Sequence, residues 1–384
     1  MDAIRFSSPP RHEAAEALRH EVRAFLAETI PARTPLARSD SWNGYDRDFS
    51  RKMGARGWLG MTWPKQYGGH ERSAFERYVV VEETLAAGAP VLSHWIADRQ
   101  SGPTLLRFGT EEQKGRVLPG IAAGETCFCI GMSEPDSGSD LAATRTRAVR
   151  SADGWRITGT KIWTSNAHNA DYMILFCRSG DSTPADRQAG TSQFLIDMKN
   201  TPGLTVRPII DLAGQHHFNE CHFEDALVPA GALIGTEGQG WQQVMSELAF
   251  ERSGPERFLS SIQLIVELIA ALQGSDSDLA RAAIGRLTAH LIVLRRLSRS
   301  VAAMLEAGEN PALHAAIVKD QGALFEQAIP DIARSLIDAE PDRAATSNYN
   351  AVLANIVLNA PSWSLRGGTR EILRGIIARG LGLR

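Results

Sequence analysis

Apolar and polar residues alternate with helical spacing through the first third of the chain. Four segments carry apolar residues three or four positions apart, at 11–30, 45–58, 75–88 and 103–124. That spacing places the apolar side chains on one face of an α-helix. Glycine and proline separate the segments, and both residues favour turns over helices. We therefore expect a helical N-terminal domain over residues 1–125.

The pattern changes in the middle of the chain. Short runs with β-branched and aromatic residues are bounded there by glycine, aspartate and asparagine. The runs cover 127–132, 154–164, 172–179, 192–198, 204–210 and 220–229. This arrangement is typical of β-strands joined by turns. It predicts a compact antiparallel β domain over residues 126–235.

Helical spacing resumes after the β region and continues to the end. Its main segments are 241–252, 279–308 and 311–337, and one further amphipathic helix closes the chain within 361–380. We expect a helical C-terminal domain over 236–384. The order of helices, strands and helices indicates an α+β fold.

Charge and cysteine content exclude several functional classes. The formal net charge is -3 and the lysines and arginines are scattered, so the basic face that binds nucleic acid is not expected. Four cysteines are too few for a disulfide framework, and Cys127 and Cys129 lack the second pair that a zinc site needs. We interpret them as buried thiols and expect no metal.

No segment of the sequence predicts membrane insertion. The first residues lack the apolar run of a signal peptide. The longest apolar stretch elsewhere, 260–274, is too short and too charged to span a bilayer. We therefore expect a cytoplasmic protein.

Two polar stretches of the β region have side chains suited to ligand binding. "MSEPDSGSDLA", at 132–142, combines hydroxyls and backbone donors that can hold a polar ring or a phosphate. "GTKIWTSNAHNAD", at 159–171, places Trp163 before Thr164 and Ser165, a flat apolar surface beside hydroxyl donors. Each stretch also has a structural interpretation, as a turn-rich loop and as a core tryptophan with capping hydroxyls.

Six stretches together resemble the acyl-CoA dehydrogenase family, in its order and roughly its spacing. They are "GWLGMTWPKQYGG", "FGTEEQKGRVLPGIAAGE", "MSEPDSGSDLA", "GTKIWTSNA", "FEDALVP" with "IGTEGQGW", and "GGTREILRGIIAR". The resemblance covers nearly the whole chain. It implies an N-terminal helical domain, a middle β domain and a C-terminal four-helix bundle, with FAD between the β domain and the bundle.

The resemblance also implies cofactor contacts. Ser139 would lie near the flavin phosphates or the thioester tail, and Thr369 and Glu371 would reach the cofactor from the last helix. Ser133 and the segment from Trp163 through Thr164 to Ser165 would lie against the flavin ring, with the backbone near Ile130 and Met132 alongside.

The implied reaction removes a proton from the carbon α to a thioester while hydride leaves the β-carbon for flavin N5. An α C–H is a weak acid, so the site needs a carboxylate base and donors for the developing oxyanion. Most relatives carry this glutamate immediately before a Gly-Thr pair, where this chain has Gly367. Its backbone N–H would still bind the thioester oxygen, and the missing side chain would leave room for a bulky acyl group.

A replacement base is expected on the first helix of the C-terminal domain. An apolar stripe there has Glu251 at its edge and Arg252 within it, and some family members place their base at this Glu-Arg position. Glu251 is our candidate base and Arg252 a candidate substrate-binding residue. Burial would raise the pKa of Glu251 and Arg252 would lower it. Glu247 is a weaker alternative, and an exposed helical glutamate is the structural interpretation.

Arg366, beside the glycine, has two interpretations. It could bind a polar acyl group, but an arginine at the start of a helix more often pairs with a nearby carboxylate.

Two departures from the family concern assembly. Segments 271–283 and 340–357 lack the Arg-x-x-Phe-Gly and Gln-Gly-Gly patterns that in relatives reach the FAD of a neighbouring subunit. Such losses resemble the heteromeric acyl-CoA dehydrogenases of bacterial steroid degradation, in which a dimer of unlike chains holds one FAD. A homo-oligomer and a hetero-oligomer with a homologous chain both remain open.

The leading interpretation is an FAD-dependent dehydrogenase that desaturates an acyl-CoA and passes electrons to an electron-transfer flavoprotein. A flavin-dependent monooxygenase of the same fold is one alternative. An accessory chain that completes a partner's FAD site is the other.

Overall fold

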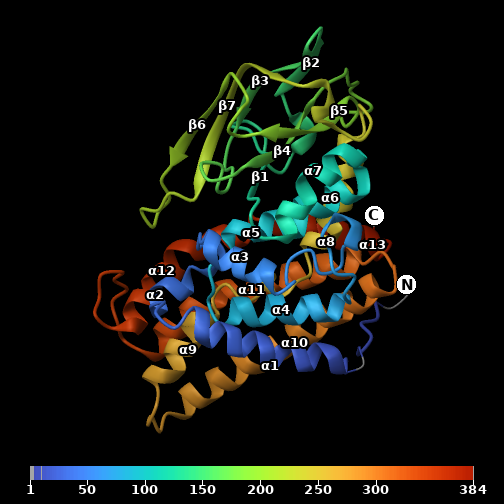
Figure 1. The fold of residues 1–384 in the computed structure, drawn as a ribbon. Helices are drawn as coiled ribbons and strands as arrows, with labels where there is room; N and C mark the ends of the chain where they lie inside the picture. Colours follow the sequence, from blue (N-terminus) through green and yellow to red (C-terminus); the bar gives the residue numbers. More distant parts are fainter. Residues whose placement is uncertain (1–3, 10, 384) are drawn as a thin grey trace. The chain divides into compact units, whose positions relative to one another are not determined.

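The computed structural model describes residues 4–9 and 11–383, and for residues 247–251 it describes the helical backbone alone. Helices begin and end the chain and strands occupy its middle, as predicted (Figure 1). The first helices are α1 (Glu13–Thr29), α2 (Pro35–Ser39), α3 (Arg47–Ala55), α4 (Ala74–Ala86), α5 (Leu92–Ile96), α6 (Gly102–Phe108) and α7 (Glu111–Ala122). The last are α8 (Gly240–Glu251), α9 (Ile262–Ala271), α10 (Asp278–Glu306), α11 (Ala312–Leu336), α12 (Asn348–Trp363) and α13 (Arg370–Gly380).

Internal packing divides the chain into two compact units. The helical unit combines Met1–Tyr45, Arg72–Val91 and Ala249–Arg384. The sheet unit combines Asp46–Glu71 and Leu92–Leu248, and it contains every strand as well as α3, α5, α6 and α7. The N-terminal helices are therefore shared between the two units. The predicted domain boundaries, which follow the order along the chain, stay a prediction.

The sheet unit is built on an eight-stranded sheet with the order β6-β7-β3-β2-β4-β5-β8 and with β1 beside β4. Its strands are β1 (Phe128–Gly131), β2 (Arg147–Ser151), β3 (Gly154–Lys161), β4 (Tyr172–Arg178), β5 (Thr191–Asp197), β6 (Leu204–Ile209), β7 (Phe218–Val228) and β8 (Leu233–Ile234). Most pairs are antiparallel, but β1 and β2 each pair with β4 in parallel. The sheet is thus mixed rather than purely antiparallel. The chain forms β2 and β3 between β1 and β4, so the connection is long enough for the crossover that a parallel pair needs.

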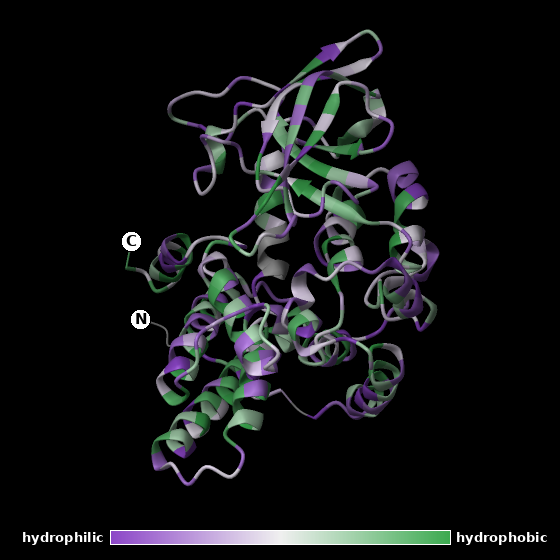
Figure 2. Cartoon of the chain, turned by 90° about the vertical axis from the view of Figure 1, so that its left-hand side faces the viewer, coloured by the Kyte–Doolittle hydropathy of each residue, from purple (hydrophilic) through white to green (hydrophobic). Residues whose placement is uncertain are grey.

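The central strands of the sheet are buried on both faces. One face packs around Trp155 and Phe194, whose ring centroids lie 5.0 Å apart. The other face packs Ile174 and Leu195 against helical residues such as Leu118. Strands covered on both sides form near-continuous apolar runs, which are visible in Figure 2. The four cysteines are free thiols in this interior, which confirms their interpretation as buried thiols.

A helix cap divides one predicted helical segment into two. The spacing over 103–124 indicated a single helix, but α6 ends before Gly109 and α7 begins after Thr110. Thr110 and Gln113 form a reciprocal capping box, in which each side chain accepts a backbone N–H of the other residue. The box satisfies donors that a helix start leaves unpaired. It therefore favours a new helix at this point.

Paired charges join three helices inside the helical unit. Arg19 of α1 donates to Glu82 of α4 over 2.8 Å and also to Glu83. Arg295 of α10 donates to the other oxygen of Glu82 over 2.6 Å. These carboxylates are almost fully buried, and a buried charge without a partner is strongly destabilising. The network therefore fixes how α1, α4 and α10 pack.

Helix α12 was not predicted from the sequence. It is buried on nearly all sides, so its apolar residues show no single helical stripe. Its buried Asn355 donates to Ser39 Oγ of α2 over 3.0 Å. Across the described ranges, no helix has the length and apolarity that a membrane span requires.

His94 of α5 is a buried titratable group of the sheet unit. Its Nδ1 lies 2.8 Å from Ser50 Oγ. Burial lowers the pKa of His94 to about 4, against a smaller opposing effect of Asp98. The unfolded chain takes up this proton near pH 6.5, whereas the folded protein does so only near pH 4. Stability from this site is therefore complete above pH 6.5 and decreases as the pH falls toward 4.

We expect His94 to cause about 2 kcal/mol of the loss in unfolding free energy between pH 6.5 and pH 5, at about 1.4 kcal/mol for each pH unit. The variant His94→Gln should be less stable than wild type at pH 7 but lose about 2 kcal/mol less on acidification. Urea unfolding followed by tryptophan fluorescence measures the difference. His20→Gln, at an exposed position of α1, should keep the wild-type dependence. Parallel curves for His94→Gln and wild type would contradict this assignment.

Candidate functional site

The two polar stretches predicted to bind a cofactor lie side by side. One follows β1 and the other follows β3. The Ile162 N–H donates to the Ser133 carbonyl, with 2.9 Å between nitrogen and oxygen. This bond brings together the residues that the resemblance placed against the flavin ring, namely Ile130, Met132, Ser133, Trp163, Thr164 and Ser165.

Trp163 presents its ring to solvent. The side chain is 56% exposed, so the interpretation as a core tryptophan is wrong. Its backbone is left-handed, with φ of 57°, a conformation that bulky residues rarely adopt outside constrained sites. The ring of Phe218 meets it edge-on at 5.8 Å between centroids. An exposed flat ring held in this way fits the planar heterocycle of a flavin.

Thr164, the residue after Trp163, is buried and held by its backbone and its side chain. Its backbone N–H and carbonyl both pair with the backbone of Asn219, at 3.0 and 3.1 Å. Its Oγ1 is buried beside the Cys221 thiol, which is its only hydrogen-bonding neighbour among the described residues and a weak one. These contacts hold Thr164 in the interior and leave the neighbouring Trp163 ring at the surface. The exposed indole is the observation that fits a bound cofactor here.

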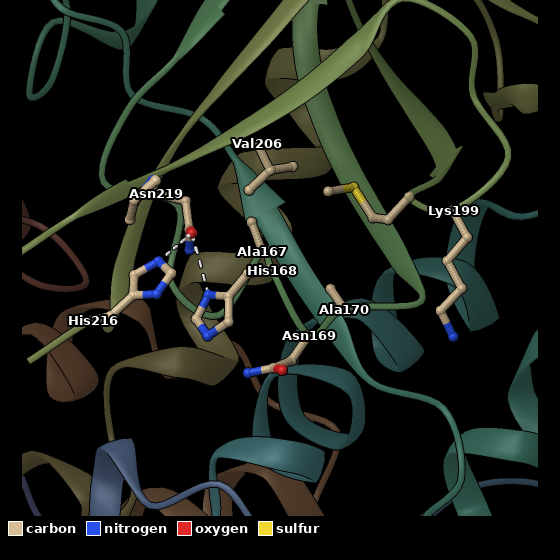
Figure 3. Close-up of a pocket in the computed structure, with 10 residues that line it drawn as sticks. Ala167, His168, Asn169, Ala170, Lys199, Val206, His216 and Asn219 are labelled. Carbon is tan, nitrogen blue, oxygen red and sulfur yellow. Dashed lines mark hydrogen bonds between the residues drawn. The ribbon is translucent and has the colours of Figure 1, made fainter.

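A pocket of about 340 Å³, which the sequence did not predict, adjoins this segment (Figure 3). Asn219 donates from Nδ2 to the Thr164 carbonyl over 3.0 Å, so its Oδ1 faces the histidines. That oxygen lies 2.8 Å from His216 Nε2 and 3.2 Å from His168 Nδ1. Because Oδ1 only accepts, both ring nitrogens carry a proton. Asn219 therefore links two stacked imidazoles to the backbone beneath Trp163.

The His168 imidazole does not readily take up a second proton. Their centroids are 3.9 Å apart, and burial, followed by the charge on His216, lowers the pKa of His168. Among the described residues, no group of three or more histidines, cysteines or carboxylates is placed to hold a metal ion. The signal in the sequence was "HHFNE" after "AHNAD". The first cluster lies at the start of β7 and the second lies after β3, and they meet at Asn219.

Ser139 lies on the exposed part of the 132–142 loop. Its neighbour Asp140 accepts from Ser137 Oγ at 2.7 Å through its carbonyl and pairs with Arg187 at 2.7 Å through its carboxylate. These bonds order the loop around Ser139. Its contact with the flavin phosphates or the thioester tail stays a prediction.

The double glycine of the last turn adopts a conformation that only glycine accepts readily. Gly367 and Gly368 have φ of 67° and 96°. Arg252, which is 5% exposed, donates from Nε to the Gly367 carbonyl over 3.1 Å. A Cβ on Gly368 would come within 3.2 Å of Arg252 Nη2. Arg252 thus holds the turn, and its role in substrate binding stays a prediction.

Arg366 pairs with a carboxylate, which confirms the second interpretation of this residue. It donates to Glu326 Oε2 over 3.0 Å and to Ser260 Oγ over 2.6 Å. Its guanidinium lies 4.3 Å from the ring centroid of Trp42. Burial lowers the pKa of Arg366 to about 10, so it remains charged at neutral pH. The residue anchors the turn from inside the helical unit.

Thr369 and Glu371 begin the last helix. Thr369 Oγ1 caps α13 by accepting from the Ile372 N–H over 3.5 Å. Glu371 is exposed in the first helical turn. A hydrogen bond from its own backbone N–H, and then one from Thr369, hold its pKa below the ordinary range. Their predicted contacts with the cofactor stay predictions.

The side chains of Glu251 and Glu247 lie outside the described residues. The backbone nevertheless locates the candidate base, because Glu251 is the last residue of α8 and precedes Arg252. The side chain of Arg252, the next residue, donates to the carbonyl of Gly367, the position that the resemblance assigns to the usual base. This hydrogen bond links the end of α8 to the turn, and the role of Glu251 as the base stays a prediction.

Three family models match consecutive parts of the chain. They describe the N-terminal, middle and C-terminal domains of acyl-CoA dehydrogenases and match residues 12–125, 129–226 and 238–382. The acyl-CoA dehydrogenase FadE29 of Mycobacterium tuberculosis is 32% identical over 379 residues, which cover 94% of each chain.

Solved structures resemble the chain over nearly its whole length. The Tcur3481-Tcur3483 steroid ACAD superposes with a TM-score of 0.85 and 29% identity, covering 98% of this chain and 99% of that chain. The ChsE4-ChsE5 complex from Mycobacterium tuberculosis gives a TM-score of 0.83 and 29% identity, covering 99% and 100%. The chain belongs to the acyl-CoA dehydrogenase family, FAD-dependent oxidoreductases that act on CH–CH groups.

Proposed function

We propose that this protein desaturates the α,β-bond of an acyl-CoA thioester, with Glu251 as the base. The observation that carries the proposal is the hydrogen bond from Arg252 to the Gly367 carbonyl. It supports the proposal because it links the residue after Glu251 to the turn that lacks the usual glutamate. A base at the end of α8 would then remove the α-proton in place of the missing glutamate.

The sheet unit supplies the surface for the flavin ring. FAD, when bound, accepts the hydride that leaves the β-carbon of the substrate. Trp163 and Ser133 would support the ring, and the buried Thr164 would keep the Trp163 segment in place. Thr369 and the N–H groups at the start of α13 favour negative charge and would stabilise an anionic part of the cofactor.

The helical unit supplies the proton chemistry. Glu251 would take the α-proton, and the Gly367 N–H would donate to the thioester oxygen as negative charge develops there. Arg252 holds the peptide after Gly367 through its carbonyl, and the pairing of the Arg366 side chain with Glu326 holds the residue before Gly367. A preorganised donor of this kind stabilises the transition state without further rearrangement.

The acyl group is proposed to be bulky and ring-bearing, and the assembly to include a homologous chain. A glycine at position 367 leaves space that a glutamate side chain would fill. Among the similar structures, one is the Tcur3481-Tcur3483 steroid ACAD and another is the ChsE4-ChsE5 complex. Electrons would pass to an electron-transfer flavoprotein. An accessory role beside a catalytic partner is the second candidate, favoured by the departures at 271–283 and 340–357.

Anaerobic titration with straight, branched and ring-bearing acyl-CoAs tests this function, with flavin absorbance as the measurement. We expect bleaching, at the lowest concentrations for ring-bearing substrates. The chain is purified both alone and after co-expression with a homologous chain. FAD that binds only in the co-expressed complex, and that bleaches unchanged when Glu251 is replaced by glutamine, would identify an accessory subunit. Bound flavin that no acyl-CoA bleaches would contradict dehydrogenase function.

A further inference from the structure

A buried ion pair lies directly behind the cofactor-facing segment of the sheet unit. Lys161, the last residue of β3, is completely buried. Its ammonium donates to the Met132 carbonyl over 2.9 Å, to Glu134 Oε1 over 2.8 Å and to Thr144 Oγ1 over 3.1 Å. All three ammonium protons therefore have acceptors.

Glu134 is equally well satisfied. Its oxygens accept from the backbone N–H groups of Arg145 and Thr146 over 2.7 and 3.0 Å, and from the Thr144 hydroxyl. Burial raises the pKa of Glu134, but Lys161 and these donors outweigh it and lower the pKa to about 2. The carboxylate is therefore charged at every pH at which the protein would work.

The pair joins three segments that the sequence keeps apart. The Met132 end of β1, the end of β3 and the start of β2 all converge on it. Ser133 and Ile162, the residues next to Met132 and Lys161, are joined by the bond from the Ile162 N–H to the Ser133 carbonyl. The ammonium thus fixes the carbonyl immediately before Ser133 and the backbone two residues before Trp163.

Stability alone does not explain an ion pair at this place. A buried pair gains little over apolar residues of the same volume, because removing two charges from water offsets their attraction. What it provides is a single geometry, since three acceptors surround one ammonium. The segments it fixes are those proposed to meet the flavin ring.

We propose that Lys161 and Glu134 are positioning residues for the flavin, holding the Met132–Ser133 backbone and the Trp163 segment in the orientation that binds the ring. This inference rests on the proposed function. Neither side chain touches the cofactor, so their effect passes through the two backbone segments.

The test compares FAD binding with folding. Lys161→Met and Glu134→Gln each remove one charge, and the double variant Lys161→Met/Glu134→Leu replaces the pair with apolar side chains. Arg156→Met, which breaks the exposed pair between Arg156 and Asp225 on β3 and β7, is the matched control. FAD affinity comes from quenching of flavin fluorescence, the orientation of the ring from visible circular dichroism, and folding from thermal melts.

We expect the double variant to stay folded yet bind FAD at least tenfold more weakly, with a changed visible spectrum. If the double variant fails to fold, Glu134→Gln provides the test, because it keeps the shape of the side chain. It should also bind FAD more weakly and have a changed visible spectrum. Arg156→Met should match wild type. A folded double variant or Glu134→Gln protein with wild-type FAD affinity and spectrum would overturn the inference alone. Wild-type protein that binds no FAD, either alone or co-expressed with a homologous chain, would overturn the proposed function as well.

Discussion

Replacing Glu251 with glutamine is expected to leave FAD bound and to slow flavin bleaching by acyl-CoA about 10³-fold. A positioned general base contributes about 10²–10⁴-fold to such a step. The amide has the size of the carboxylate but cannot take up the α-proton. The Gly367 N–H and the flavin surface on the sheet unit remain, so substrate should still bind. Stopped-flow absorbance under anaerobic conditions measures the bleaching rate.

Glu247→Gln is the matched control, because it makes the same chemical change one helical turn earlier on α8. Its flavin should be bleached at a rate within a few-fold of the wild-type rate. If Glu247→Gln loses activity and Glu251→Gln does not, the base is Glu247. If the flavin of both variants is bleached at the wild-type rate, neither glutamate of α8 is the base. The base would then be sought near the turn at Gly367.

The order of elements was predictable because it depends on local patterns. Apolar spacing located α1, α4, α10 and α11, and strand composition located β1 and β3 to β7. The cap at Thr110 was also readable in principle, since a threonine three residues before a glutamine is a capping-box signature. The prediction of one helix there was wrong because the apolar spacing continues across the boundary.

Features that depend on contacts between distant segments were not predictable in the same way. The parallel pairing of β1 with β4 follows from a crossover, and strand composition is the same for both directions. Helix α12 has apolar residues on nearly all sides and therefore no amphipathic signal. Lys161 and Glu134 belong to the two motifs and are 27 residues apart in the sequence. Only the fold shows that they form an ion pair.

The candidate site was located by motifs rather than by periodicity. Trp163, Thr164 and Ser133 were predicted together, and the structure joins their segments through the bond between Ile162 and Ser133. The structure shows Arg252 in contact with the Gly367 carbonyl. Its predicted role in substrate binding stays a prediction. A glycine there removes the usual base, and the same glycine permits the backbone conformation that Arg252 holds.

Replacing Arg366 with methionine is expected to lower the unfolding free energy by about 3–5 kcal/mol. Glu326 is 1% exposed, and without Arg366 its buried charge would lose this ion pair and keep the hydrogen bond from the Ser260 N–H. The long methionine side chain fills part of the vacated volume, so the loss comes mainly from the charge. Urea unfolding at pH 7 measures it, and the double variant Arg366→Met/Glu326→Gln should recover more than half of the loss.

Arg374→Met is the control for the same change at an exposed arginine, because its side chain is 61% exposed and 3.8 Å from Asp320. Its effect should stay below about 1 kcal/mol. A loss in Arg366→Met no larger than this would show that the buried pair does not anchor the turn. If Arg366 anchors the turn, its loss moves the peptide that carries the Gly367 N–H. Flavin bleaching by acyl-CoA should then be slower in Arg366→Met protein that is still folded. The two measurements together then connect the stability of the helical unit to the donor that the reaction needs.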